Sequence, residues 1–144
     1  MVNALAMAGH AALLAGDLEA ARGLRAELEA TGIHGPAPDA DRLALDAGIA
    51  ALAGSADEAF ALYRQAARSY QDLGLIWDEA LAGLEMASVL GVESEAVRTI
   101  AAQTRATLEG LRALPVLALL DGVLSRPARP VSPTEQQLVE TPAR

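Results

Sequence analysis

The sequence predicts an all-α fold, and three observations support this prediction. The chain has 144 residues and is 52% hydrophobic, which is enough for one domain with a core. Most of its hydrophobic residues are alanine and leucine, which favour helices, whereas the β-branched and aromatic residues that favour strands are sparse. Glycines and capping residues also divide residues 1–125 into pieces of helical length.

The first three helices follow from these boundaries. The first is predicted over residues 3–15, where a glycine ends it, and the second over residues 17–31, with Asp17 as its N-cap. The stretch 33–39 contains two prolines and is predicted to be a loop. A third helix fits residues 40–53 and ends at the next glycine.

The fourth helix begins with a capping-box pattern formed by Ser55 and Glu58. In such a box the hydroxyl and the carboxylate would satisfy two backbone N–H groups that the helix leaves unpaired. This helix is expected to run over residues 55–73. Gly74 then takes the left-handed conformation that ends many helices.

Three further helices complete the predicted set. One spans residues 76–90 and ends at a glycine, and the next spans residues 94–111 with Ser94 as its N-cap. The last is short, over residues 115–124, and opens with a proline, a residue well suited to the first helical turn.

The C-terminal residues differ from the rest in composition. Residues 126–144 contain four prolines and few apolar side chains, so they cannot build a packed element. The sequence therefore predicts a helical domain over residues 1–125, followed by a disordered tail or linker.

The sequence does not contain the residues that several classes of chemistry require. The chain has no cysteine, and all of its basic residues are arginine, which excludes disulfides, cysteine nucleophiles and Schiff-base lysines. The two histidines, His10 and His34, have no second metal ligand one helical turn later. No glycine-rich phosphate loop or nucleophile motif occurs. We therefore expect no catalytic, metal or cofactor-binding residues, and a small free-standing enzyme has no supporting constellation.

Charge and the N-terminal residues limit the partners and the location. The net charge of −8 opposes binding to nucleic acid, whose phosphates require a basic surface. The N-terminal residues lack both a basic leader region and an uninterrupted apolar span, so no membrane insertion is expected. A cytoplasmic location is the resulting expectation.

A repeated spacing relates the predicted helix pairs. Six positions of the first pair recur in the second pair with the same spacing and with identical or similar residues. They are Leu5, Gly9, Ala12, Gly16, Asp17 and Ala21, matched by Leu43, Ala47, Ala50, Gly54, Ser55 and Ala59. The third pair begins in the same way with Trp77, Leu81 and Leu84.

This spacing resembles the tetratricopeptide repeat (TPR). The second pair matches its signature positions in order, at Leu43, Ala47, Ala50, Gly54, Ala59, Tyr63 and Ala66. The first pair has Arg25 where a large aromatic residue is usual, and the third has the signature Trp77 but lacks the usual Gly-Asp turn. The resemblance implies a TPR-like α-solenoid of about three antiparallel helix hairpins with a short C-terminal capping helix.

Residues 59–124 carry a second resemblance. They are similar to the end of the TPR-like regions of large bacterial signalling proteins, which join such a region to an ATPase or adenylate cyclase module, or to a LuxR-type DNA-binding domain. The resemblance implies a non-catalytic protein-interaction or regulatory module of a larger signalling ATPase or cyclase-type protein. The alternative is a sensor or oligomerisation segment of a LuxR-type transcription regulator. The sequence leaves open whether Met1 is the natural start.

The resemblance also implies a partner-binding groove, lined in TPR arrays by the first helix of each pair. The corresponding positions are Asn3, His10, Asp41, Ala44, Asp78 and Glu85. Most of them are polar or acidic in a chain rich in alanine. We therefore expect the groove to suit a protein or peptide with basic side chains.

Self-association is a competing use of the surface. The last predicted helix would cap the stack only by burying Val116, Leu119, Leu120 and Val123. The first helix pair lacks an obvious polar cap on its N-terminal side, so that face would pair with another surface, such as a second copy, if preceding repeats had been removed.

All four aromatic residues of the chain lie between Phe60 and Trp77. Phe60, Tyr63 and Tyr70 share one stripe of the fourth helix, and Trp77 opens the fifth. We expect all four to pack at the junction of the second and third hairpins. Trp77→Ala is then the substitution expected to destabilise the fold most.

Overall fold

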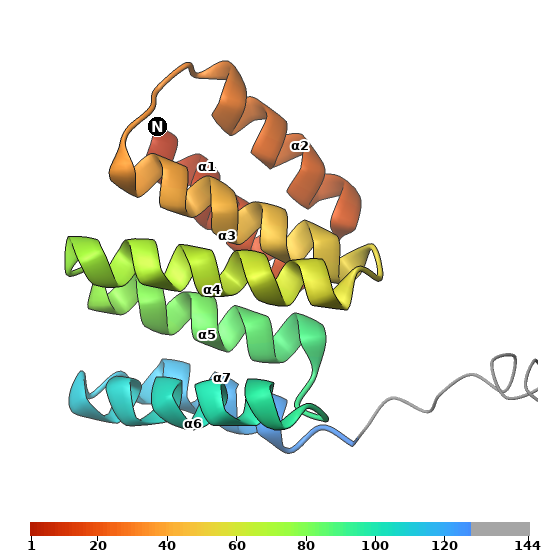
Figure 1. Ribbon diagram of the computed structural model, residues 1–144, viewed down its shortest axis with the longest axis vertical. Coiled ribbons are helices and arrows are strands. Elements are labelled where there is room, and N and C mark those ends of the chain that lie inside the picture. The colour runs from red at the N-terminus through yellow and green to blue at the C-terminus, as the bar shows by residue number, and fades with distance from the viewer. Residues whose placement is uncertain (128–144) are drawn as a thin grey trace, which may run out of the picture.

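The computed structural model describes residues 1–127, which form seven helices and the short segments between them (Figure 1). The helices are α1 (Val2–Leu14), α2 (Leu18–Ala30), α3 (Pro36–Leu52), α4 (Ala56–Leu73), α5 (Ile76–Leu90), α6 (Glu95–Gly110) and α7 (Leu114–Leu124). None of these helices is both long and apolar enough to cross a membrane. The predicted tail lies, from residue 128 onward, outside the described residues.

The helix prediction is confirmed, with one boundary corrected. Both ends of every helix lie at most one residue from the predicted position, except for the start of α3. That helix begins at Pro36, with Gly35 as its N-cap, so the predicted loop 33–39 is too long. Proline is tolerated in a first turn, because the N–H that it lacks would have no helical partner there. Pro36 and Pro38 therefore open the helix instead of delaying it.

The predicted caps differ in outcome. The carboxylate of Asp17 accepts a hydrogen bond from the backbone N–H of Ala20 at 3.0 Å, which confirms its capping role. Ser55 and Ser94 occupy N-cap positions, but neither side chain forms a capping hydrogen bond, so the capping box at Ser55 is wrong. The first turn of α4 is instead acidic, which is favourable to the helix dipole. Gly74 has the predicted left-handed conformation, with φ of 69°.

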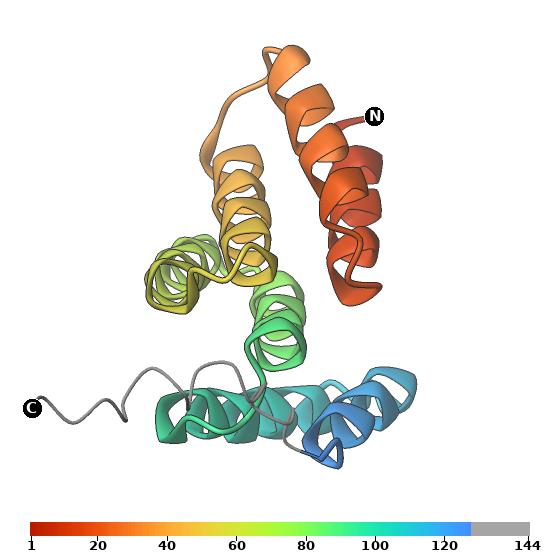
Figure 2. The same cartoon turned by 90° about the vertical axis from the view of Figure 1, so that its right-hand side faces the viewer.

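Consecutive helices pack in pairs, and the pairs stack. Contacts join α1 to α2, α3 to α4 and α5 to α6, while α7 packs on α5 and α6. The first helices of the three pairs, α1, α3 and α5, also contact one another. In Figures 1 and 2, α1 and α2 lie at one end of the stack and α6 and α7 at the other. The centre of the stack is thus the meeting point of α1, α3 and α5.

Glycines allow α1 and α3 to approach closely. A Cβ atom at Gly9 would lie 2.7 Å from Cδ2 of Leu45, and one at Gly48 would overlap the side chain of Leu13. Both leucines are buried in a cluster that also includes Ala21 and Leu28 of α2. Each glycine therefore accepts a leucine from the facing helix, which packs the first pair against the second.

The aromatic residues do not share one environment. Tyr63 and Tyr70 are buried and Phe60 is partly buried, but Trp77 is 43% exposed. The expectation that Trp77 is a core residue is therefore wrong. The buried residues of α5 begin at Ala80, about one turn after Trp77, so the indole lies at the end of the helix beyond the packed part.

The predicted cap of the stack is only partly present. Leu120 and Val123 of α7 are buried and Val116 is partly buried, but Leu119 is 59% exposed. Among the described helices, α7 contacts only α5 and α6, so a single face of this apolar helix is covered. The condition for capping, burial of all four side chains, is therefore not met at Leu119.

Candidate functional site

A small hollow of about 20 Å³, room for about one water molecule, lies where α1, α3 and α5 meet. We call it the acidic hollow; it is lined by Asn3, Ala6, Met7, His10, Asp41, Tyr70, Asp78, Leu81 and Ala82. Four of the residues that the sequence assigned to a groove, Asn3, His10, Asp41 and Asp78, thus come together at one place. They belong to three helices that are far apart in the chain.

Helical spacing explains why α1 contributes several of these side chains. Asn3, Met7 and His10 are separated by four and three residues, so they lie along one side of α1. Asp41 comes from α3 and Asp78 from the first turn of α5. Because each of these helices contacts the other two, the three sets of side chains converge.

The fifth predicted groove residue, Glu85, lies beneath the surface. Its side chain is 2% exposed. Oε1 accepts a hydrogen bond from the hydroxyl of Tyr63 at 2.7 Å, and Oε2 lies 2.7 Å from Nδ1 of His10. Glu85 is therefore not open to a partner in the way the groove prediction requires. It joins α1, α4 and α5 and holds His10 at the edge of the hollow.

The protonation of His10 depends on these neighbours. Burial lowers the pKa of His10, but the hydrogen bond to Glu85 and the negative charges of Glu85, Asp41 and Asp78 raise it by more. The net pKa is therefore above the usual value, which favours the imidazolium. As a cation, His10 donates its Nδ1 proton to Glu85. Nε2 has no hydrogen-bond partner among residues 1–127 and is left as a donor at the hollow.

Asp41 is held by a second buried tyrosine. The hydroxyl of Tyr70 donates to Oδ1 of Asp41 at 2.8 Å. Burial raises the pKa of Asp41, and the hydrogen bond from Tyr70 and the nearby His10 only partly oppose this. Burial and the nearby carboxylates also raise the pKa of Tyr70, so its phenol stays protonated and remains a donor.

Asp78 and Asn3 have the most capacity to bind a ligand. Neither side chain has a hydrogen bond or an ion pair with any other residue of the described part of the chain. Asp78 is partly buried and Asn3 is exposed. Together with Asp41 they offer two carboxylates and an amide around one hollow, beside the apolar side chains of Met7 and Leu81. Such a set suits a basic side chain with an apolar stem.

Three further residues differ from the sequence-based expectation. Ala44, which the resemblance placed on the groove, is fully buried in the core. Tyr63 and Tyr70 were expected to pack at the junction of two hairpins, and their hydroxyls also position Glu85 and Asp41. A signal existed in the sequence: a tyrosine on a buried helix face needs a hydrogen-bond partner, and the acidic residues of the other helices were the available acceptors.

The hollow offers hydrogen-bond acceptors and negative charge, but its side chains are not arranged as metal ligands. Within residues 1–127, no group of three or more histidine, aspartate or glutamate side chains is arranged to hold a metal ion. What the site can do is bind a cation through Asp41 and Asp78 while His10 and Asn3 donate hydrogen bonds to neighbouring acceptors. Comparisons of the chain with protein-family models, with curated proteins and with solved structures find no match.

Proposed function

We propose that this chain is a non-catalytic, TPR-like interaction module that binds a peptide or protein through the acidic hollow. The partner places the cationic group of an arginine or lysine side chain over the mouth of the hollow, against Asp41 and Asp78. Asn3 and the Nε2 atom of His10 bind backbone carbonyls beside it. The observation that carries the proposal is the convergence of Asn3, His10, Asp41 and Asp78 from three different helices.

Charge and burial support a basic partner. Asp41 is already held in place by Tyr70, so binding does not have to order its side chain. Asp78 is partly buried, and a carboxylate that is partly removed from water gains more from a cationic partner than a fully exposed one. The net charge of −8 adds long-range attraction for a basic ligand.

The repeat interpretation supports the position of the site. α1, α3 and α5 are the first helices of their pairs, and these are the helices that would line the groove of a TPR-like array. We also propose that the module regulates a larger bacterial signalling protein of the ATPase or adenylate cyclase type. This part of the proposal rests on the resemblance of residues 59–124.

The proposal is tested by selecting ligands without assuming their sequence. A displayed library of short linear peptides is selected on the folded chain, and the best binder is synthesised with a fluorescent label. We expect selected peptides to share an arginine or lysine. The affinity of the labelled peptide is measured by fluorescence anisotropy. It should be lower by about tenfold or more for the variant Asp41→Asn/Asp78→Asn than for the wild type, because two charge-assisted contacts are lost.

A matched control removes the same charge elsewhere. Glu27 and Asp72 are exposed, and their side chains form no hydrogen bond or ion pair within the described residues. The variant Glu27→Gln/Asp72→Asn should keep the affinity within about twofold. The proposal is wrong if the selected peptides lack basic residues, or if both double variants bind the peptide equally well.

A further inference from the structure

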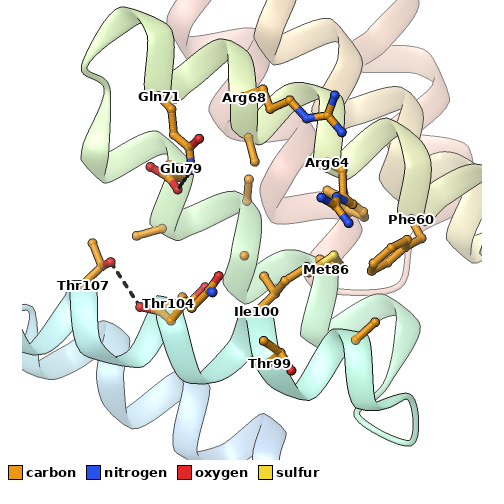
Figure 3. Close-up of a pocket in the computed structure, with 17 residues that line it drawn as sticks. Phe60, Arg64, Arg68, Gln71, Glu79, Met86, Thr99, Ile100, Thr104 and Thr107 are labelled. Atoms are coloured by element: carbon orange, nitrogen blue, oxygen red, sulfur yellow. Dashed lines mark hydrogen bonds between the residues drawn. The ribbon is translucent and has the colours of Figure 1, made fainter.

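A larger cleft lies on another side of α5, between α4 and α6. Both helices contact α5, but their backbones do not contact each other, so α5 forms the floor of an open cleft of about 420 Å³. Figure 3 shows side chains of all three helices around this space. Its volume falls in the range of small-molecule sites in proteins, about 300–1,000 Å³.

The cleft has an apolar centre and polar walls. Phe60 and Ile100 contribute apolar surface, Met86 lies almost fully buried beneath it, and Gly83 on the floor is covered by the side chain of Thr104. Arg64 and Arg68 line the α4 side, one helical turn apart, and Thr99, Thr104 and Thr107 lie on the α6 side (Figure 3). Gln103 of α6 also lines the cleft. We call this space the arginine cleft. An apolar body with a few convergent polar groups is typical of a ligand site.

Within residues 1–127, Arg64 and Arg68 are exposed and unpaired, as are Arg112 and Arg126, but Arg64 and Arg68 both line one cleft. Neither Arg64 nor Arg68 forms a hydrogen bond or an ion pair with any residue among the first 127. Other arginines of the chain do find carboxylates: Arg22, Arg25, Arg42 and Arg105 each form at least one ion pair. The chain has 19 acidic residues against 11 basic ones, so acceptors are plentiful. Two guanidinium groups without a partner on one cleft point to an anion from outside.

The two ends of the cleft differ in charge. The only carboxylate among the lining residues is Glu79, and it accepts a hydrogen bond from Gln71 at 2.5 Å. Figure 3 places Gln71 and Glu79 at one end, and Phe60 and Arg64 at the other, with Arg68 between them. The guanidinium of Arg64 lies 6.0 Å from the centre of the Phe60 ring, at the limit of a cation–π contact. An anion is therefore favoured near Arg64 and Arg68, away from Glu79.

We infer that the arginine cleft binds a small anionic amphiphile, a molecule with a carboxylate attached to an apolar body. The carboxylate accepts hydrogen bonds from Arg64 and Arg68, whose planar guanidinium groups match its geometry. The apolar body lies against Phe60, Ala67 and Ile100. This site lies on a different side of α5 from the acidic hollow, and its ligand has the opposite charge.

The test uses decanoate as the probe and decanamide as its neutral counterpart. Binding to the full chain is measured by isothermal titration calorimetry, and ¹H–¹⁵N spectra locate the contact. We expect decanoate to shift resonances of α4, α5 and α6 around the cleft and to bind more tightly than decanamide. The variant Arg64→Gln/Arg68→Gln should weaken decanoate binding by about tenfold or more and leave decanamide unaffected.

Two further variants keep the test decisive. Arg112→Gln removes a positive charge outside the cleft and should leave decanoate binding within about twofold. Ala67→Phe fills part of the cleft from the α4 side and should weaken both probes. Circular dichroism confirms that each variant is folded. The inference is overturned if decanoate does not bind the wild type, if the double arginine variant binds it unchanged, or if only an acidic peptide binds at these arginines.

Discussion

The imidazole of His10 and the carboxylate of Glu85, 75 positions apart in the chain, lie with Nδ1 2.7 Å from Oε2. His10 is on α1 and Glu85 on α5, so the contact forms only when the first and third helix pairs close on α3. The same carboxylate accepts a hydrogen bond from the hydroxyl of Tyr63 on α4. One buried group therefore joins three helices at the centre of the stack.

Removing this carboxylate should destabilise the whole fold. Glu85→Ala leaves the hydroxyl of Tyr63 and the imidazole of His10 without their acceptor, and we predict a loss of about 3 kcal/mol in the free energy of unfolding. Urea unfolding followed by circular dichroism measures this loss. The control Glu27→Ala changes an exposed glutamate and should cost at most about 0.5 kcal/mol. Equal losses in the two variants would show that the hydrogen bonds of Glu85 do not stabilise the fold.

The raised pKa of His10 predicts a pH dependence with a definite sign. A group whose pKa is higher in the folded state stabilises that state fully below its unfolded pKa, near 6.5, and loses this contribution as pH rises through the folded pKa. The melting temperature of the wild type should therefore be higher than that of His10→Asn. This difference should be largest at about pH 6 and should become smaller toward about pH 8 and above. Asp41 also has a raised pKa, but it titrates at lower pH.

Thermal unfolding followed by circular dichroism at several pH values measures that difference. Replacing His10 also removes a positive charge that lowers the pKa of Asp41, so the comparison uses only pH values of about 6 and above. A difference in melting temperature that stays constant from about pH 6 to above pH 8 would exclude the assigned interaction.

The two aromatic residues that flank the α4–α5 turn should differ in their importance. Tyr70 is buried and bonded to Asp41, so we predict that Tyr70→Ala costs about 3 kcal/mol or more. Trp77 is 43% exposed, and Trp77→Ala should cost at most about 1.5 kcal/mol. Denaturant titrations of the two variants give the comparison, and a larger loss for Trp77→Ala would mean that the indole is packed after all.

Two glycines provide a test of the α1–α3 packing. A Cβ atom at Gly48 would overlap the side chain of Leu13, which is itself buried and has little room to move. Gly48→Ala should therefore lower the free energy of unfolding by about 1–3 kcal/mol. Gly23 lies within α2 with no side-chain neighbour for a new methyl group, so Gly23→Ala should stabilise by about 0.5–1 kcal/mol. Melting temperatures of the two variants should move in opposite directions. A stabilising Gly48→Ala would contradict the close approach of the two helices.

Helix positions were readable from the sequence because local signals set them. Asp17 and Gly74 act at the ends of α2 and α4 through contacts within a few residues, and such signals need no knowledge of the fold. The start of α3 was missed because a proline in a first turn resembles a loop proline. The exposure of Trp77 was missed for another reason: it depends on how far the neighbouring helices extend, which helical periodicity does not reveal.

The candidate site was readable only in part. The repeat spacing predicted that Asn3, His10, Asp41 and Asp78 share one surface, because equivalent positions of stacked hairpins lie side by side. The burial of Glu85 could not be predicted, because it depends on α1 and α4 both supplying a hydrogen-bonding partner. The arginine cleft was missed entirely. Its existence depends on the separation of α4 from α6, which is a matter of helix packing and leaves no local pattern.

A charge exchange across the acidic hollow tests the proposed function most directly. The affinity of the selected basic peptide, and of the same peptide with its basic residue replaced by glutamate, is measured against wild type and Asp78→Arg. We predict that the wild type prefers the basic peptide and that Asp78→Arg prefers the glutamate peptide, each by about tenfold or more. If Asp78→Arg still prefers the basic peptide, the acidic hollow is not the binding site.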